Sequence, residues 1–295
     1  MITKIGSKIQ KVLEIFFRKR IILNIINFKA KNKRVNLNWA PICVKKFKFI
    51  TWKSDSKKQN LGDYLAIPIF EYMVNKNHID SNKKISETKH LYTIGSIILL
   101  GHQNATIWGS GILFSEPKNF IWKRNKYREL DIRCVRGPET LRRLTENGYD
   151  TSKCVMGDPG VLLPLIYKPT TFAQKKEYSV IIHMSKDFDV QNKIDILTDN
   201  WQTTIDEIYN SKLIISSSLH GIILAESYGI PAILLDKFEF NDLFKYNDYY
   251  YSTGRYEYPV CRTIEEALNT PPAPLPDLSK LQENLINSFP IDLWN

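Results

Sequence analysis

The chain has little cysteine, and its cysteines are not grouped. Four occur among 295 residues, at Cys43, Cys134, Cys154 and Cys261, without a C-x-x-C pair or a Cys/His cluster. Structural zinc sites and disulfide frameworks both need cysteines at close, repeated spacings. We therefore expect no metal site, no disulfide framework and a cytoplasmic location.

Long hydrophobic runs are also missing near the N-terminus. The longest uncharged run of that region, Ile21–Phe28, is far shorter than the roughly 20 apolar residues that span a bilayer. The region also lacks the long apolar core and small-residue cleavage site of a secretory signal. We expect neither a membrane-spanning helix nor a secretory signal there.

Acidic residues are scarce in one part of the chain only. Residues 1–50 contain 13 Lys or Arg and a single acid, Glu14, whereas residues 51–295 carry 28 basic and 30 acidic residues. The net charge of +10 therefore belongs to an N-terminal element, which we place at residues 1–45. Because the remainder is nearly neutral and shows no nucleic-acid reader motif, we expect no nucleic-acid partner.

This N-terminal element alternates large apolar residues with cations at roughly helical spacing. A basic amphipathic helix of this kind can lie in the headgroup region of an anionic membrane. The alternative is a solvated helix that packs on the domain behind it. The sequence leaves both open, and the first predicts peripheral attachment to the inner face of the cytoplasmic membrane.

Short apolar strands alternate with helices from about residue 47 onward, and the Pro/Lys/Thr-rich stretch Tyr167–Glu177 interrupts the pattern. Such alternation is typical of βαβ units with parallel strands and helices on both faces. The sequence thus predicts an α/β fold with two lobes facing a central cleft, at residues 46–168 and 177–270. A proline-rich linker and a terminal helix follow at residues 271–295.

Some elements are predicted with clear local signals. A helix is expected over Asn60–Asn75, with one apolar face, and another over Pro138–Asn147, which has proline in its first turn and Gly148 after its end. The tyrosine-rich segment Tyr246–Tyr258 is instead predicted to be an irregular surface loop.

The segment Leu213–Asp236 (LIISSSLHGIILAESYGIPAILLD) predicts a strand, a turn, a helix to Tyr228 and a second strand. The turn between a parallel strand and the following helix is where open α/β sheets bind ligands. Helix N-termini favour anions there, and a histidine can transfer protons near neutral pH. We therefore expect a site for a phosphorylated or carboxylated ligand, formed by Ser216, Ser217, Ser218, His220 and Gly221.

Polar residues follow several other predicted strands, and each has a functional and a structural interpretation. Asp63 either caps a helix or faces the cleft. Gly109, Ser110 and Gly111 form either a phosphate turn or a close backbone contact. Arg136 offers a bidentate fork for an anion, or a surface salt bridge. Two further residues are left equally open, as cleft residues or as a turn acid and a structural histidine: Asp158 and His183.

Taken in order, these motifs resemble the polysaccharide pyruvyltransferase family. The similarity covers about residues 47–236, and the segment around His220 is its most specific part. The motifs that carry it are Asn60–Asp63, Thr93–Ser96, Ile107–Gly111, Val135–Pro138, Met156–Pro159, Ile181–His183, Ser217–Gly221 and Ala225–Pro231.

The resemblance implies two Rossmann-like lobes of the GT-B type and transfer of a pyruvyl group from phosphoenolpyruvate to a sugar, usually as a cyclic ketal. Phosphoenolpyruvate would be the donor substrate, no cofactor is expected, and the acceptor would be a surface saccharide or its lipid-linked precursor. The catalytic candidates are His220, with Asp63 or Asp158 as the base. The substrate-binding candidates are Arg136, Ser217, Ser218, Gly221, Gly109, Ser110, Gly111, His183 and Glu226.

One position departs from the family pattern. Many members have arginine two residues before the motif histidine, where this chain has Ser218. Arg136 or a lysine elsewhere must then supply the positive charge. A GT-B glycosyltransferase using a nucleotide sugar stays open as the alternative, and a binding protein built on a decayed pair of lobes is the third interpretation.

Overall fold

The computed structural model describes residues 39–43, 46–47, 59–79, 89–100, 104–115, 125, 128–183, 188–237 and 242–294. Most of the predicted N-terminal element lies outside these residues. Within the described residues, no helix combines the length and the hydropathy needed to cross a bilayer.

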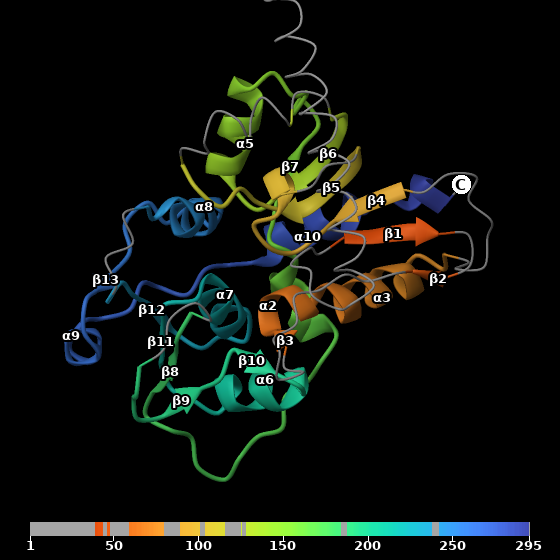
Figure 1. Cartoon of the computed structure of the whole chain (residues 1–295). Coiled ribbons are helices and arrows are strands. Elements are labelled where there is room, and N and C mark those ends of the chain that lie inside the picture. Colours follow the sequence, from red (N-terminus) through yellow and green to blue (C-terminus); the bar gives the residue numbers. More distant parts are fainter. Residues whose placement is uncertain are drawn as a thin grey trace, which may run out of the picture.

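The first sheet is mixed and lies in the upper half of Figure 1. Four of its strands are parallel, and β1 pairs antiparallel with both β2 and β4. In spatial order, the sheet consists of β2 (Lys46–Phe47), β1 (Trp39–Cys43), β4 (Lys89–Tyr92), β5 (Ala105–Ser110), β6 (Leu130–Val135) and β7 (Val155–Met156). Its helical elements are α3 (Ala66–Lys76), α5 (Pro138–Glu146) and the 3₁₀ turns η1 (Ile98–Leu100) and η2 (Pro159–Leu165).

The second sheet is entirely parallel and lies below the first. Its strands in spatial order are β13 (Val260–Cys261), β12 (Ala232–Leu235), β11 (Ile214–Ser216), β8 (Ser179–Ile181) and β9 (Lys193–Ile194). The accompanying helices are α6 (Trp201–Tyr209), α7 (Leu219–Ser227) and α9 (Ile264–Asn269). The α/β class with parallel strands is thus confirmed.

Two connections join the two sheets. A separate antiparallel pair links β3 (Gln59–Asn60) to β10 (Leu197–Thr198), so α2 (Leu61–Tyr64) begins beside the second sheet. Helix α7 packs on both β11 and η2, and it is apolar almost all round, as expected of a buried helix. The largest core cluster accordingly contains buried side chains from both sheets.

The C-terminal segment returns to the first sheet. Helix α10 (Ser279–Asn287) packs against β7 and η2 before the short turn η3 (Ile291–Trp294). The indole Nε1 of Trp108, a buried residue of β5, donates to the carbonyl of Leu285 at 2.9 Å. This hydrogen bond holds the end of the chain against the strands formed near its beginning.

The prediction of an irregular loop over Tyr246–Tyr258 is wrong for its first half. Residues Phe244–Ser252 form helix α8, and Tyr246, Tyr249 and Tyr250 are fully buried. Asp242 supports the start of the helix, because its Oδ1 accepts from the Phe244 N–H at 2.9 Å. Consecutive tyrosines hide the helical period in the sequence, since each has an apolar ring and a polar tip.

Candidate active site

The turn between β11 and α7 is held in shape by its own serines. Ser216 Oγ donates to the Ser218 carbonyl at 2.9 Å and accepts from the Ser218 N–H at 3.0 Å. Ser217 Oγ accepts from the backbone N–H of His183 at 2.8 Å. A Cβ on Gly221 would lie 2.3 Å from Ser216 Oγ, so only glycine allows this close packing.

The N-terminus of α7 has the features of an anion site. Ser218 occupies the N-cap position without a side-chain capping bond. No hydrogen bond to the N–H groups of Leu219, His220 or Gly221 is recorded among the described residues. Unpaired N–H groups and the positive end of the helix dipole favour a bound anion at this point.

His220 lies in the first turn of α7 and faces the other half of the molecule. A Cβ on Gly62 of α2 would lie 1.9 Å from His220 Nδ1, so the ring packs directly on the Gly62 backbone. The imidazole Nε2 is buried and has no hydrogen-bond partner within the described part of the chain. The Asn60–Asp63 and Ser217–Gly221 motifs, far apart in sequence, therefore meet at this ring.

The His220 side chain is partly exposed, yet its pKa is lowered to about 3. Burial of the ring is the main cause, and the positive charges of Arg136, Lys245 and His183 add to it. The sequence predicted a histidine that exchanges protons near neutral pH. Without a bound anion the imidazole is instead neutral there, and an anion beside it would raise its pKa.

Lys245 is a site residue that the sequence analysis missed. It lies on α8, is only partly exposed, and its positive charge acts on His220. Burial and the neighbouring Arg136 lower the pKa of Lys245 to about 8, so the amine is still mostly cationic at neutral pH. Because most of α8 was predicted as a loop, the sequence did not indicate that this lysine lies near the histidine.

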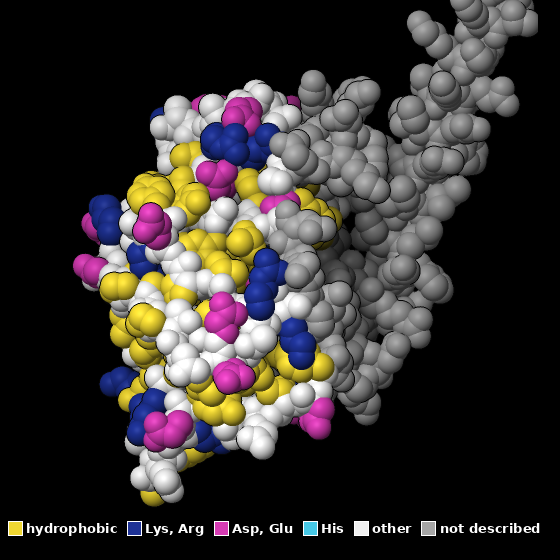
Figure 2. All heavy atoms as spheres, turned by 90° about the vertical axis from the view of Figure 1, so that its left-hand side faces the viewer, with side chains coloured by type: hydrophobic (Ala, Val, Ile, Leu, Met, Phe, Trp, Pro, Cys, Tyr) yellow, Lys and Arg dark blue, Asp and Glu magenta, His cyan; other side chains and the backbone are white. Residues whose placement is uncertain are grey.

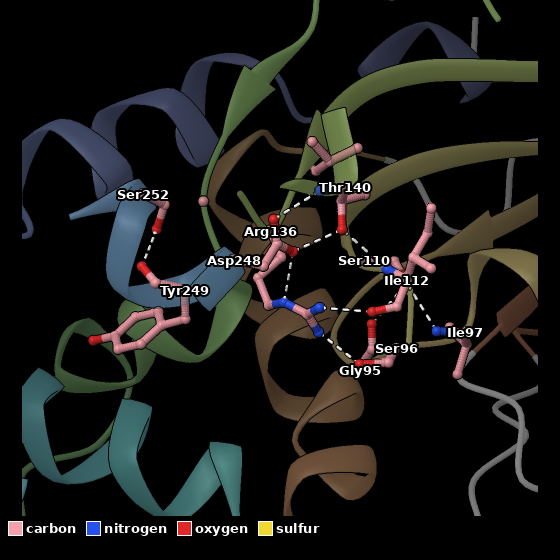
Figure 3. Close-up of polar contacts among 12 residues, drawn as sticks. Gly95, Ser96, Ile97, Ser110, Ile112, Arg136, Thr140, Asp248, Tyr249 and Ser252 are labelled. Atoms are coloured by element: carbon pink, nitrogen blue, oxygen red, sulfur yellow. Dashed lines mark hydrogen bonds and ion pairs between the residues drawn. The ribbon is translucent and has the colours of Figure 1, made fainter. Parts of the chain in front are cut away.

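Arg136 follows β6 and is almost completely buried, with 1% of its surface exposed. Figure 3 shows its guanidinium between three elements: Nε pairs with Asp248 at 2.9 Å, Nη1 donates to Ser96 Oγ at 2.6 Å, and Nη2 donates to the Ile112 carbonyl at 2.8 Å. The salt bridge that the sequence left open is thus a buried one, rather than a surface pair. Three of the five N–H groups already have protein acceptors.

Gly109, Ser110 and Gly111 shape the backbone around this arginine. Gly109 has φ of +85°, and a Cβ there would collide with Pro159. Ser110 Oγ is buried and donates to the Gly95 carbonyl at 2.8 Å. A Cβ on Gly111 would lie 2.4 Å from the Arg136 Cζ. These contacts match the close-packing interpretation.

Asp63 is not the cap of its helix. Asn60 caps α2, because its Oδ1 accepts from the Asp63 N–H at 3.2 Å. Asp63 sits in the first turn with its carboxyl partly exposed, and burial raises its pKa to about 7. A carboxyl that titrates near neutral pH can both accept and deliver a proton.

Asp158 lies below the surface, with no exposed area. Its Oδ1 accepts from the Gly160 N–H at 2.9 Å, capping η2, and its Oδ2 is buried without a hydrogen-bond partner in the described residues. Burial is the main cause that raises its pKa to about 6, and the Asp248 charge adds to it, while Arg136 opposes it. Asp158 therefore belongs to the layer beneath the site rather than to its surface.

Comparison with known proteins gives these residues a context. A family model described as polysaccharide pyruvyl transferase matches residues 8–236, most of the chain. The chain belongs to the polysaccharide pyruvyl transferase family.

Two individual proteins are similar over parts of their length. Uncharacterized protein L143 of Acanthamoeba polyphaga mimivirus is 34% identical over 159 residues, which are 50% of this chain and 53% of that protein. The chain thus spans about half the length of this curated relative. The crystal structure of a functionally uncharacterized protein from Klebsiella pneumoniae covers 66% of this chain and 84% of its own, at 16% identity and a TM-score of 0.42.

One motif residue of this pyruvyl transferase family member, Glu226, lies away from the N-terminus of α7. Glu226 is six positions beyond His220, or about 9 Å along the helix axis. Its carboxylate is engaged by both terminal nitrogens of Arg255, at 2.6 Å each, and by the Tyr249 hydroxyl at 2.7 Å. The structure gives Glu226 a packing role and does not bring it to the anion site.

One further residue, His183, stands at the rim. His183 follows β8, is partly exposed, and its charge acts on His220. The structure therefore brings together His220, His183, Lys245, Ser218 and the Gly62 backbone. Arg136 and Asp158 lie behind them.

Proposed function

We propose that the chain transfers a pyruvyl group from phosphoenolpyruvate to two hydroxyls of a saccharide, forming a ketal. The observation that supports this most directly is the cationic N-terminus of α7. Unpaired N–H groups, the partly exposed Lys245 and the neutral His220 converge there. A donor with a phosphate and a carboxylate needs such a set of donors and cations.

Lys245 supplies the charge that many family members place two residues before the histidine. Ser218 occupies that position here, and its side chain makes no capping bond to the α7 N–H groups. We propose that the donor phosphate binds these N–H groups and the Lys245 amine, next to the imidazole of His220. Arg136 contributes through its field, because its side chain is buried and largely occupied.

The reaction requires three changes of bonding. A proton adds to the methylene carbon of phosphoenolpyruvate, two sugar oxygens bond to the central carbon, and the C–O bond to phosphate breaks. Of the two protons released by the sugar hydroxyls, one balances the proton on the new methyl group and one leaves with phosphate. We propose that Asp63, with a pKa of about 7, carries one of these protons. His220, which becomes more basic beside the bound phosphate, hydrogen-bonds the leaving group.

Titration calorimetry tests this proposal. Wild type should bind phosphoenolpyruvate saturably, and Lys245→Met should weaken binding about 10–100-fold, the value of a hydrogen bond to a charged group. Lys212→Gln is the matched control, because Lys212 is exposed and paired with Glu177 at 2.6 Å. Binding of a uridine or guanosine diphosphate sugar, with none of phosphoenolpyruvate, would replace the proposal with a glycosyltransferase.

We further propose that the two sheets form the two lobes of a GT-B arrangement, with the acceptor saccharide entering between α2 and α7. The apposition of Gly62 and His220 supports this, since it brings one motif from each side to a single point. A lipid-linked acceptor would place the protein at a membrane surface. Peripheral attachment through residues 1–45 at the cytoplasmic face follows from their excess of cations.

A further inference from the structure

Helix α8 is held by both halves of the molecule. In Figure 1 it lies at the left, between α5 and the strands of the second sheet. The Tyr246 hydroxyl donates to the Ser217 carbonyl at 2.9 Å, and so ties α8 to the turn before α7. On the other side, α8 packs against α5.

The contact with α5 centres on the carboxylate of Asp248. This residue is fully buried, and its two oxygens accept from Arg136 Nε at 2.9 Å, the Thr140 N–H at 2.8 Å and the Thr140 hydroxyl at 2.6 Å. Figure 3 shows these bonds converging on one side chain. Since the N-cap Gly137 has no side chain, Asp248 acts as the capping carboxylate of α5 from a different helix.

The backbones also meet closely here. A Cβ on Gly137 would lie 1.8 Å from the carbonyl oxygen of Asp248. No side chain separates α8 from the turn after β6, so the height of α8 above this turn is set by backbone contact and by the carboxylate.

Lys245 lies three residues before Asp248 on the same helix. Positions i and i+3 lie on one helix face, so a shift or rotation of α8 at Asp248 also moves Lys245. The Lys245 Nζ lies 4.9 Å from the centroid of the Tyr246 ring, whose hydroxyl is bonded to the Ser217 carbonyl, three residues before His220.

We infer that Asp248 is a positioning residue: by holding Arg136 and the N-terminus of α5 against α8, it places the Lys245 amine beside His220. The expected change in KM rests on the proposed function, whereas the expected placement of the Lys245 amine does not. Asp248 does not reach the site surface. It acts through Arg136 and through the helix that carries Lys245.

The test compares Asp248→Asn with Asp292→Asn, a matched substitution in an exposed ion pair with Arg133. In Asp248→Asn we expect the KM for phosphoenolpyruvate to rise about 10-fold or more, with kcat within about threefold of wild type. Thr140→Val removes one hydrogen bond to the same carboxylate, together with the one that the Thr140 hydroxyl accepts from the Ile112 N–H at 3.0 Å. It should shift KM in the same direction by a smaller factor. This second variant carries the test if Asp248→Asn does not fold.

A second readout is independent of the substrate. Lysines labelled by reductive ¹³C-methylation can be titrated by NMR, with Lys245 assigned by its loss in Lys245→Arg. Loss of the Asp248 charge lowers the Lys245 midpoint even without movement, because the Arg136 charge is no longer balanced. The positioning role is therefore read in Thr140→Val, which keeps the carboxylate: we expect the Lys245 midpoint to shift there because the amine is displaced.

An unchanged Lys245 midpoint in Thr140→Val together with an unchanged KM in a folded Asp248→Asn variant would overturn the inference and leave Asp248 a stability residue. If wild type neither binds nor consumes phosphoenolpyruvate, but the Lys245 midpoint moves in Thr140→Val, the positioning role stands and the proposed function fails.

Discussion

Gly62 allows the two halves of the site to come into direct contact. Its missing side chain lets the His220 ring pack on the α2 backbone, where any Cβ would lie 1.9 Å from Nδ1. Glycine is needed here for close approach, rather than for a left-handed backbone.

Gly62→Ala should therefore displace His220 while leaving the fold intact. We expect a loss of about 1–3 kcal/mol in stability and a roughly 100-fold loss of turnover, because small displacements of reacting groups are costly. Circular dichroism and steady-state rates would measure the two effects. Gly148→Ala is the control: no atom lies near its Cβ, so only its positive φ should cost stability, and turnover should persist.

The neutral His220 predicts a particular pH dependence of stability. Its pKa is lowered in the folded state, so it stabilises the fold above its unfolded pKa and loses that contribution as the pH falls from about 6.5 toward 3. Asp63 has a raised pKa, and its contribution changes in the opposite direction, being lost as the pH rises from 3.8 toward 7.

His220→Gln removes the first effect and keeps the second. Relative to wild type, the variant should gain stability as the pH falls from 6.5 to 5, by at most about 1.4 kcal/mol per pH unit and less because the ring is partly exposed. Urea unfolding at pH 7.5, 6.5 and 5 would show it. A constant difference between the two proteins across this range would contradict the lowered pKa.

At the scale of elements, α7 has two separate ends. Its N-terminus presents His220 and the unpaired N–H groups, while its C-terminal part is anchored by the ion pair of Glu226 with Arg255. The Arg255 guanidinium also lies over the Tyr250 ring, 4.6 Å from its centroid. The C-terminal part of α7 is thus held by buried contacts with α8 and with Arg255, which follows α8.

Breaking the ion pair of Glu226 with Arg255 should affect stability more than ligand binding. Arg255→Met leaves the Glu226 carboxylate buried without its cation, so we expect the free energy of unfolding to fall by about 3–5 kcal/mol. Phosphoenolpyruvate affinity, measured by calorimetry below the melting temperature, should stay within about threefold of wild type. A large loss of affinity in the folded variant would restore Glu226 as a binding residue.

At the scale of the whole molecule, charge and fold are separable. On the face shown in Figure 2, cationic and anionic side chains are interspersed, in keeping with the nearly neutral balance of residues 51–295. The surplus of cations lies before the first described strand. That strand, β1, begins at Trp39 and pairs with β4, before residue 46 where the sequence placed the first lobe.

Because β1 begins at Trp39, a deletion that tests membrane attachment should end before that residue. Deleting residues 1–38 should reduce co-sedimentation with vesicles of anionic phospholipid and preserve activity on a soluble acceptor. Deleting residues 1–45 also removes β1, and so should lower stability as well. Vesicle binding that survives the shorter deletion would refute the proposed attachment.

Part of this protein could be predicted from local sequence. Alternating strands and helices predicted the α/β class, and the ordered motifs predicted the family, which the family model confirms. The strand–turn–helix around His220 was also predicted, and α7 ends at Ser227, one residue before the expected Tyr228. Local periodicity suffices for these features, because apolar spacing determines which face of each element is buried.

Other features depended on contacts between distant segments. The packing of α8 brings Lys245 toward His220 and lets Asp248 cap α5. Each of these contacts joins residues more than 20 positions apart in the sequence. The same holds for the pKa values, since burial and neighbouring charge arise only when the chain packs. Sequence thus determined most elements and the family, whereas tertiary structure decided which candidates face the site: Arg136 and Asp158 are buried and Glu226 is paired elsewhere. The sequence allowed for a lysine without saying which, and only the packing of α8 brings Lys245 toward His220.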